Sequence, residues 1–66
     1  IAVRNVCIAS VPMRTGPSIA YAPIEILTAG TTVQVINSLL NTAGYEWSLI
    51  QVGATSGYVP AASICL

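Results

Sequence analysis

The sequence has very few charged side chains. Its 66 residues include two arginines and two glutamates, whereas lysine, aspartate and histidine do not occur. With Arg4 and Arg14 as the only cations, neutralising a row of phosphates is not feasible, which argues against binding nucleic acids or anionic lipids. Glu25 and Glu46 stand far apart in the sequence, and no histidine is present to activate a nucleophile. We therefore expect no catalytic residues and no enzymatic activity.

Long apolar runs are also missing, although hydrophobic residues make up 55% of the chain. Gly, Pro, Asn, Ser and Thr interrupt every candidate before it reaches the roughly 18 residues of a membrane-spanning helix. The chain opens at Ile1 without a charged and apolar leader, so we expect any targeting peptide to be absent or already removed. Two cysteines without a histidine cannot complete a tetrahedral zinc site. We expect no membrane contact, no metal and no cofactor.

The side chains that are present suit one small domain covering residues 1–66. A chain that is so apolar and has no net charge is expected to collapse rather than stay disordered. A domain of this size buries only about 60% of its unfolded surface, so a covalent link would help it. We predict a disulfide between Cys7 and Cys65, contributing about 4 kcal/mol. Free buried thiols in a cytosolic protein are the alternative, but the low charge and the Ala/Ser/Thr-rich composition favour a secreted, extracellular protein.

Short segments rich in Val, Ile, Thr and Tyr recur between Gly, Pro and Asn, which is typical of β-strands. No stretch keeps a helical apolar period for three turns. Residues 60–63 suit a single 3-10 turn. The sequence thus predicts an all-β fold, a small barrel of five to six short antiparallel strands in a rolled meander, with this turn before the last strand. The expected strands are 2–8, 24–27, 32–38, 47–52, 56–60 and 64–66.

Several motifs occur together in a recognisable order. Val-Pro-Met-Arg-Thr-Gly-Pro-Ser at 11–18, then Tyr21, then Ile-Leu-Thr-Ala-Gly-Thr-Thr-Val at 26–33, resemble the bacterial-type SH3-like (SH3b) domain. Chains of that family commonly read L-N-V-R-S-G-P-S, an aromatic residue and L-x-x-G-T-x-V. Residues 47–50 look like its W-x-x-V strand and residues 57–59 like its G-[WY]-V strand. The family often has Asn where Pro12 stands. Low charge and a terminal cysteine pair look more like the modules of secreted fungal muramidases.

The resemblance, which covers residues 11–64, implies a cell-wall-binding module. Such domains bind the stem peptide or the glycine-containing cross-bridge of bacterial peptidoglycan and hold a covalently attached catalytic domain, such as a muramidase, on the wall. A monomer without net charge would bind through apolar contact, stacking and hydrogen bonds to a peptide backbone.

Two other functions remain open. In one, the domain is a structural or protein-interaction module that packs on a catalytic domain or partner through its apolar exterior and binds no wall polymer. In the other, it binds proline-rich peptides as eukaryotic signalling relatives do, although the first loop lacks the acidic cluster that such ligands usually require.

Aromatic side chains are the first candidates for ligand contact. Alternation along the strand places Trp47 on one face and Ile50 and Val52 on the other. If Ile50 and Val52 fill the barrel, Trp47 faces outward. A tryptophan covered by a neighbouring loop is the alternative. Beside Tyr58, Val59 is the better barrel filler, so we expect Tyr58 to offer its ring and hydroxyl to a ligand.

Four further residues complete the predicted ligand-binding set. Tyr21 follows the Gly-Pro-Ser turn and Tyr45 lies in a hairpin connection, where each either contacts ligand or covers a loop. Asn5 could offer its amide to a peptide backbone. Arg14 either contacts ligand or, as we favour, satisfies loop carbonyls or pairs with a glutamate. Met13 is expected in the core.

Overall fold

The computed structural model describes residues 2–40 and 44–65. Within these ranges the chain forms seven β-strands and one short 3-10 helix. The elements are β1 (Ala2–Val6), β2 (Ser10–Arg14), β3 (Pro23–Thr28), β4 (Thr32–Leu40), β5 (Glu46–Val52), β6 (Thr55–Pro60), η1 (Ala61–Ser63) and β7 (Ile64–Cys65). The all-β fold and the 3-10 turn before the last strand are confirmed, with seven strands rather than five or six.

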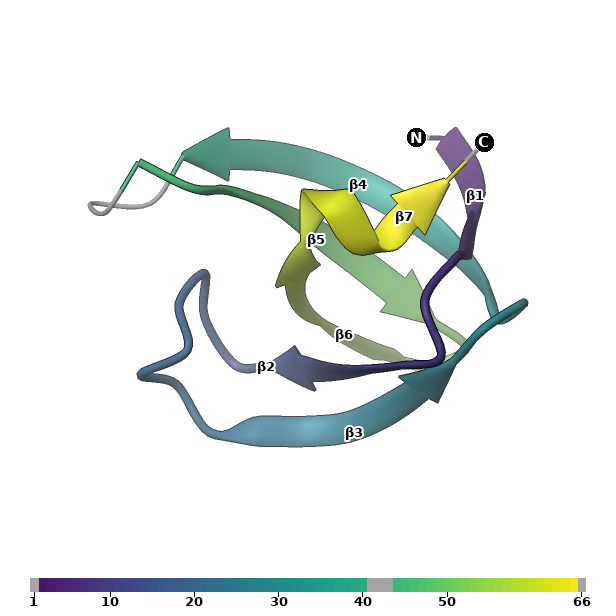
Figure 1. Cartoon of the computed structure of the whole chain (residues 1–66), viewed down its shortest axis with the longest axis horizontal. Helices are drawn as coiled ribbons and strands as arrows, with labels where there is room; N and C mark the ends of the chain where they lie inside the picture. The colour runs from purple at the N-terminus through teal and green to yellow at the C-terminus, as the bar shows by residue number, and fades with distance from the viewer. Residues whose placement is uncertain (1, 41–43, 66) are drawn as a thin grey trace.

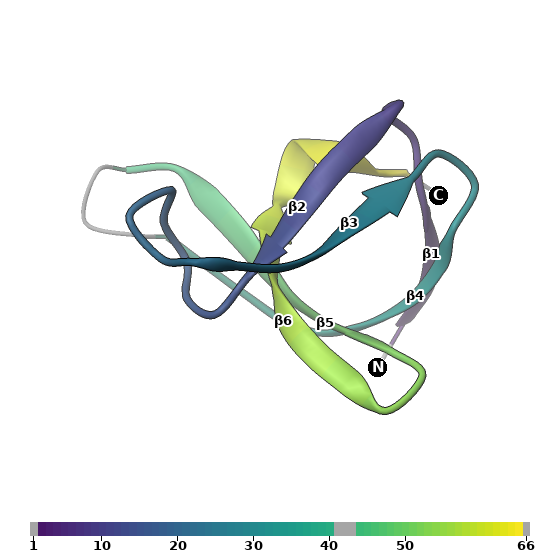
Figure 2. The same ribbon diagram turned by 90° about the horizontal axis from the view of Figure 1, so that it is seen from below.

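The strands form one antiparallel sheet that curls around an apolar interior. Its order is β3-β2-β6-β5-β4-β1-β7, so β4, β5 and β6 form a meander as predicted, whereas β1 lies between β4 and β7 and β2 adjoins β6. Figure 1 shows the β2–β3 hairpin across the bottom of the view, facing β4 and β5, and Figure 2 shows the curl from below. In the part of the chain that the structure describes, β3 and β7 are the edges of this sheet.

The expected strands leave out β2, which carries Pro12 at its centre. Proline cannot donate to a ladder, which argues against a central strand. In the structure Pro12 pairs with Ile26 of β3, while toward β6 the pairing of β2 is limited to Arg14 with Tyr58. The strand therefore makes few ladder bonds toward β6, and proline is tolerated.

Seven buried side chains form the central cluster. They are Val6, Val11, Met13, Leu27, Val33, Ile50 and Val59. Both the β2–β3 hairpin and the β4–β6 meander contribute, so the cluster joins the two halves of the sheet. The expected core position of Met13 and the inward position of Val59 are confirmed, since both are 0% exposed. Burial of each such side chain contributes about 1.5–3 kcal/mol.

Gly57 lies where β6 passes closely over β2. A Cβ at this position would lie 2.5 Å from Met13 Cγ, 2.9 Å from Arg14 O and 3.2 Å from Ile24 Cδ1. We expect Gly57→Ala to destabilise the fold by about 1–3 kcal/mol, because a backbone oxygen and the base of a core side chain would have to move. Urea unfolding followed by circular dichroism measures this.

The neighbouring exposed residue provides the control for this substitution. Ser56→Ala on the same strand should leave the unfolding midpoint nearly unchanged. If Gly57→Ala unfolds at the wild-type urea concentration, the close approach of β6 to β2 is wrong.

The predicted disulfide is present between Cys7, just after β1, and Cys65, at the end of β7. The two Cα atoms are 5.6 Å apart, within the usual range for a disulfide, and the sequence separation is 58. Strand pairing supports the same junction, since Asn5 lies opposite Cys65 and Val6 opposite Ile64. Nearly the whole chain therefore lies inside one covalent loop.

Candidate functional site

A cleft of about 820 Å³ lies at one end of the molecule. It is bordered by the loop of residues 15–22, by the start of β5, and by the segment where β6 passes into η1. Its lining residues are Ser18, Ile19, Tyr45, Glu46, Trp47, Pro60, Ala61 and Ala62. Apart from Ser18 and Glu46 these are apolar or aromatic, a composition typical of a site for a small ligand or an extended peptide.

Trp47 lines this cleft, and of the two alternatives expected for it the structure matches the covered tryptophan. Only 4% of its surface is exposed, although it does not belong to the central cluster around Ile50. Alternation correctly places it on the face opposite Ile50. That face is covered here, because Trp47 lies between its cross-strand neighbours Leu39 and Pro60, and β5 contacts η1. Trp47 therefore offers the cleft only a small part of its surface.

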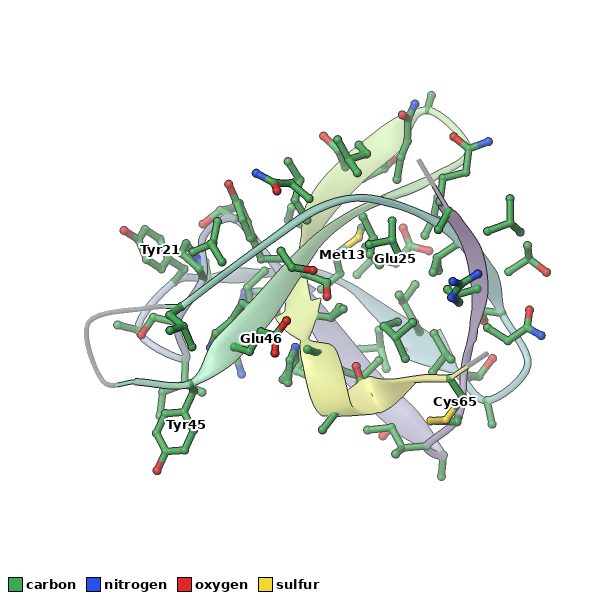
Figure 3. All side chains as sticks on the ribbon, turned by 90° about the horizontal axis from the view of Figure 1, so that it is seen from above. Met13, Tyr21, Glu25, Tyr45, Glu46 and Cys65 are labelled. Atoms are coloured by element: carbon green, nitrogen blue, oxygen red, sulfur yellow. A yellow bond between two sulfur atoms is a disulfide. The ribbon has the colours of Figure 1, made fainter. Side chains whose placement is uncertain are left out.

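Tyr45 and Ile19 supply the exposed apolar surface of the cleft. Tyr45 is 71% exposed and Ile19 is 79% exposed, whereas the side chains of the central cluster are almost fully buried. Figure 3 shows Tyr45 projecting from the end of the molecule that lies away from Cys65. The structure thus brings the predicted residues Tyr45 and Trp47 into one cleft, with Tyr45 as the accessible ring.

Arg14 holds the loop that carries Ile19. Its Nη1 donates hydrogen bonds to the carbonyl oxygen of Tyr21 at 2.9 Å and to that of Ile19 at 3.4 Å. The backbone N–H of Thr15 closes the base of the loop by donating to Ala22 O at 3.1 Å. The predicted role of Arg14 in satisfying loop carbonyls is confirmed, whereas direct ligand contact by its guanidinium stays a prediction.

Tyr21 packs on the loop rather than into the cleft. A Cβ on Gly16 would lie 2.6 Å from three ring carbons of Tyr21, so the ring lies directly against the Gly16 backbone. Tyr21 nevertheless remains 48% exposed and lies at the same end of the molecule as Tyr45 (Figure 3). It is absent from the cleft lining, so its contact with ligand stays a prediction.

The structure places Tyr58 and Asn5 away from the cleft lining. Tyr58 is half-buried on β6, opposite Leu49 on one side and Arg14 on the other. Asn5 lies on β1 opposite Cys65, and its Oδ1 accepts a hydrogen bond from Thr32 Oγ1 at 3.3 Å. Neither residue joins Tyr45 and Trp47, so ligand binding by Tyr58 and Asn5 remains a separate prediction.

Most of the cleft lining was not predicted from the sequence. The missed residues are Ser18, Ile19, Glu46, Pro60, Ala61 and Ala62. Ile19 could have been identified as a candidate because it is an isoleucine between polar and small residues of a loop. The contribution of Pro60 depends on its pairing with Trp47, which requires the register between β5 and β6.

Residues 2–40 and 44–65 hold no group of three or more His, Cys, Asp or Glu side chains arranged to bind a metal ion. No helix among the described residues is both long and apolar enough to cross a membrane. The described lining of the cleft offers apolar surface, the hydroxyls of Ser18 and Tyr45, and the carboxylate of Glu46.

Comparison with known proteins agrees with this geometry. The family model described as bacterial SH3 domain matches residues 9–64. No curated protein and no solved structure gave a significant match. The matched segment runs from just before β2 to the first residue of β7 and so includes every element that borders the cleft. The chain belongs to the bacterial SH3 domain family, whose members are non-catalytic binding modules.

Proposed function

We propose that this chain binds peptide segments of bacterial peptidoglycan and keeps an attached lytic enzyme, such as a muramidase, on the cell wall outside the cell. The observation that supports this most is the open apolar cleft with Tyr45 and Ile19 exposed at its border. Membership of the bacterial SH3 domain family and the Cys7–Cys65 disulfide are consistent with such a role.

The cleft suits a peptide with small side chains. Ala61 and Ala62 line one wall of the cleft with small side chains. The Tyr45 ring offers a flat apolar surface on which an extended backbone can lie. Ser18 adds a hydroxyl for hydrogen bonding to peptide groups. Glycine-containing or alanine-containing segments fit because larger side chains would lift the backbone away from the ring.

Long-range electrostatic attraction contributes little to this binding. The formal net charge is zero, so long-range attraction to an anionic wall is not available. We expect raising the salt concentration to about 0.3 M to change the affinity by less than tenfold, unlike binding that releases many counterions. The affinity of the isolated module should be micromolar to millimolar, and tethering raises the local concentration of the attached enzyme.

The direct experiment is sedimentation of the chain with purified peptidoglycan. Tyr45→Ala should weaken binding about tenfold and Ile19→Ala about fivefold, because each removes apolar surface that the ligand covers. Both side chains are largely exposed, so the unfolding midpoints should stay close to that of the wild type.

Ile26→Ala provides the matched control. Ile26 is 57% exposed but lies on β3, outside the cleft lining, so its loss should leave binding unchanged. Equal weakening by Ile19→Ala and Ile26→Ala would contradict the assignment of the cleft, and a wild-type chain that fails to sediment would contradict wall binding.

An interaction with a partner protein is the second candidate function. The edge strand β3 carries two exposed isoleucines, Ile24 and Ile26, which are 45% and 57% exposed. Such exposed apolar side chains favour association with another protein surface. Sedimentation equilibrium at high concentration distinguishes the two functions. Association of the chain would favour the partner-protein function. A chain that stays monomeric and binds peptidoglycan does not need these exposed isoleucines for its function.

A further inference from the structure

One charged side chain lines the mostly apolar cleft. Glu46 is the first residue of β5, is exposed, and lies in sequence between Tyr45 and Trp47, which both line the cleft. Figure 3 shows the Glu46 carboxylate closer to the centre of the molecule than the Tyr45 ring. Glu46 therefore belongs to the same cleft lining as Tyr45.

Neither of the two cations of the chain neutralises this carboxylate. Arg14 Nη1 donates to Tyr21 O and Ile19 O, and Arg4 Nη1 donates to Val3 O on β1, at 2.9 Å. Neither arginine lines the cleft, and the sequence has no lysine and no histidine. The described lining of the cleft therefore carries one negative charge without an arginine to balance it.

We infer that the cleft is specific for a peptide segment that bears a free primary ammonium group, which pairs with Glu46 while the adjoining backbone lies on Tyr45 and Ile19. This inference rests on the proposed function and names the chemistry of its ligand. An ammonium offers three N–H donors and a positive charge, which complement a carboxylate beside an apolar surface. A carboxylate-terminated segment would be repelled by Glu46.

The inference has a direct consequence for the polymer. Wall peptides carry primary amines either on the side chain of a diamino residue of the stem or at the end of an unlinked bridge. Cross-linking converts such an amine into an amide, which has no positive charge and a larger substituent. The chain should therefore prefer peptide segments that are not yet cross-linked.

Acetylation of the polymer tests this preference. Purified peptidoglycan is divided, and the amines of one half are blocked with acetic anhydride. Wild-type chain should bind the untreated half about fivefold more tightly than the acetylated half, the size expected for one partly exposed ion pair. Glu46→Gln should bind both halves with the same affinity, because the amide carries no charge. Glu46→Asp, which keeps the charge, should retain part of the preference.

Glu25→Gln is the matched control. It makes the same chemical change and the same change in net charge at the other glutamate, which lies on β3 outside the cleft lining. It should keep the wild-type preference for untreated wall. A preference that Glu25→Gln abolishes to the same extent as Glu46→Gln would overturn the inference, because only the net charge would then matter.

The remaining outcomes separate the inference from the proposed function. Equal sedimentation of the wild type with both halves would overturn the ammonium specificity while wall binding stands. Failure to sediment with either half would overturn both. Two soluble pairs then identify the amine: triglycine amide against its N-acetyl form, and a lysine-containing alanine peptide against its Nζ-acetyl form. Preference for neither free amine would also overturn the inference.

Discussion

Reduction of the Cys7–Cys65 disulfide should lower the free energy of unfolding by about 4 kcal/mol, because the bond closes a loop of nearly the whole chain and restricts the unfolded ensemble. Domains of this size typically have a total stability of only about 5–10 kcal/mol. Urea unfolding of the oxidised chain, with and without a reductant, measures the difference through circular dichroism. We expect the reduced chain to unfold at a much lower urea concentration.

The double variant Cys7→Ala/Cys65→Ala distinguishes loss of the bond from an effect of the reductant. It should unfold near the midpoint of the reduced wild type, whether or not reductant is present. Coincident unfolding curves for oxidised and reduced wild type would show that the strand pairing of β1 with β7 holds the ends together without help from the disulfide.

Truncation of Trp47 should destabilise the fold by about 3–5 kcal/mol, the usual cost of deleting a large buried aromatic side chain. Trp47 is 4% exposed and lies between Leu39 and Pro60, so Trp47→Ala leaves a cavity between β4, β6 and η1. Thermal and urea unfolding, followed by far-ultraviolet circular dichroism, measure the loss. Trp47→Phe should recover a large part of it, because most of the volume is kept.

Tyr45→Ala is the control for this substitution. Tyr45 lines the same cleft but is 71% exposed, so we expect its truncation to change stability by no more than about 0.5 kcal/mol. The two variants should therefore separate stability from binding, with Trp47→Ala affecting the fold and Tyr45→Ala affecting the ligand. If Trp47→Ala unfolded with the wild-type midpoint, Trp47 would not be a structural residue.

The sequence was sufficient for the fold class because its strands are short, alternating and separated by Gly, Pro or Asn. β2 was not predicted, since a proline at its centre is tolerated only where few ladder bonds are needed toward β6, and that depends on strand order. The positions of β1 and β2 in the sheet also depend on pairing between distant segments, such as Arg4 with Val33. Local pattern does not determine such pairings.

The candidate site was predicted less completely than the fold. Alternation gave the correct face for Trp47 but not its burial, because the cover comes from cross-strand neighbours and from η1. For Arg14, the hydrogen bonds to loop carbonyls were one of the two structural roles expected, the other being a pair with a glutamate. Ile19 and Glu46 were missed because their presence in one cleft depends on how the 15–22 loop is placed relative to the start of β5.

The position of the disulfide also determines how the molecule responds to mechanical load. The bond joins Cys7 and Cys65 at the end of the molecule away from Tyr45 (Figure 3). A pull applied to the chain on both sides of this bond passes through the two sulfur atoms, so the segment between them carries no tension. The cleft would keep its shape while the molecule is pulled from the two ends of its chain.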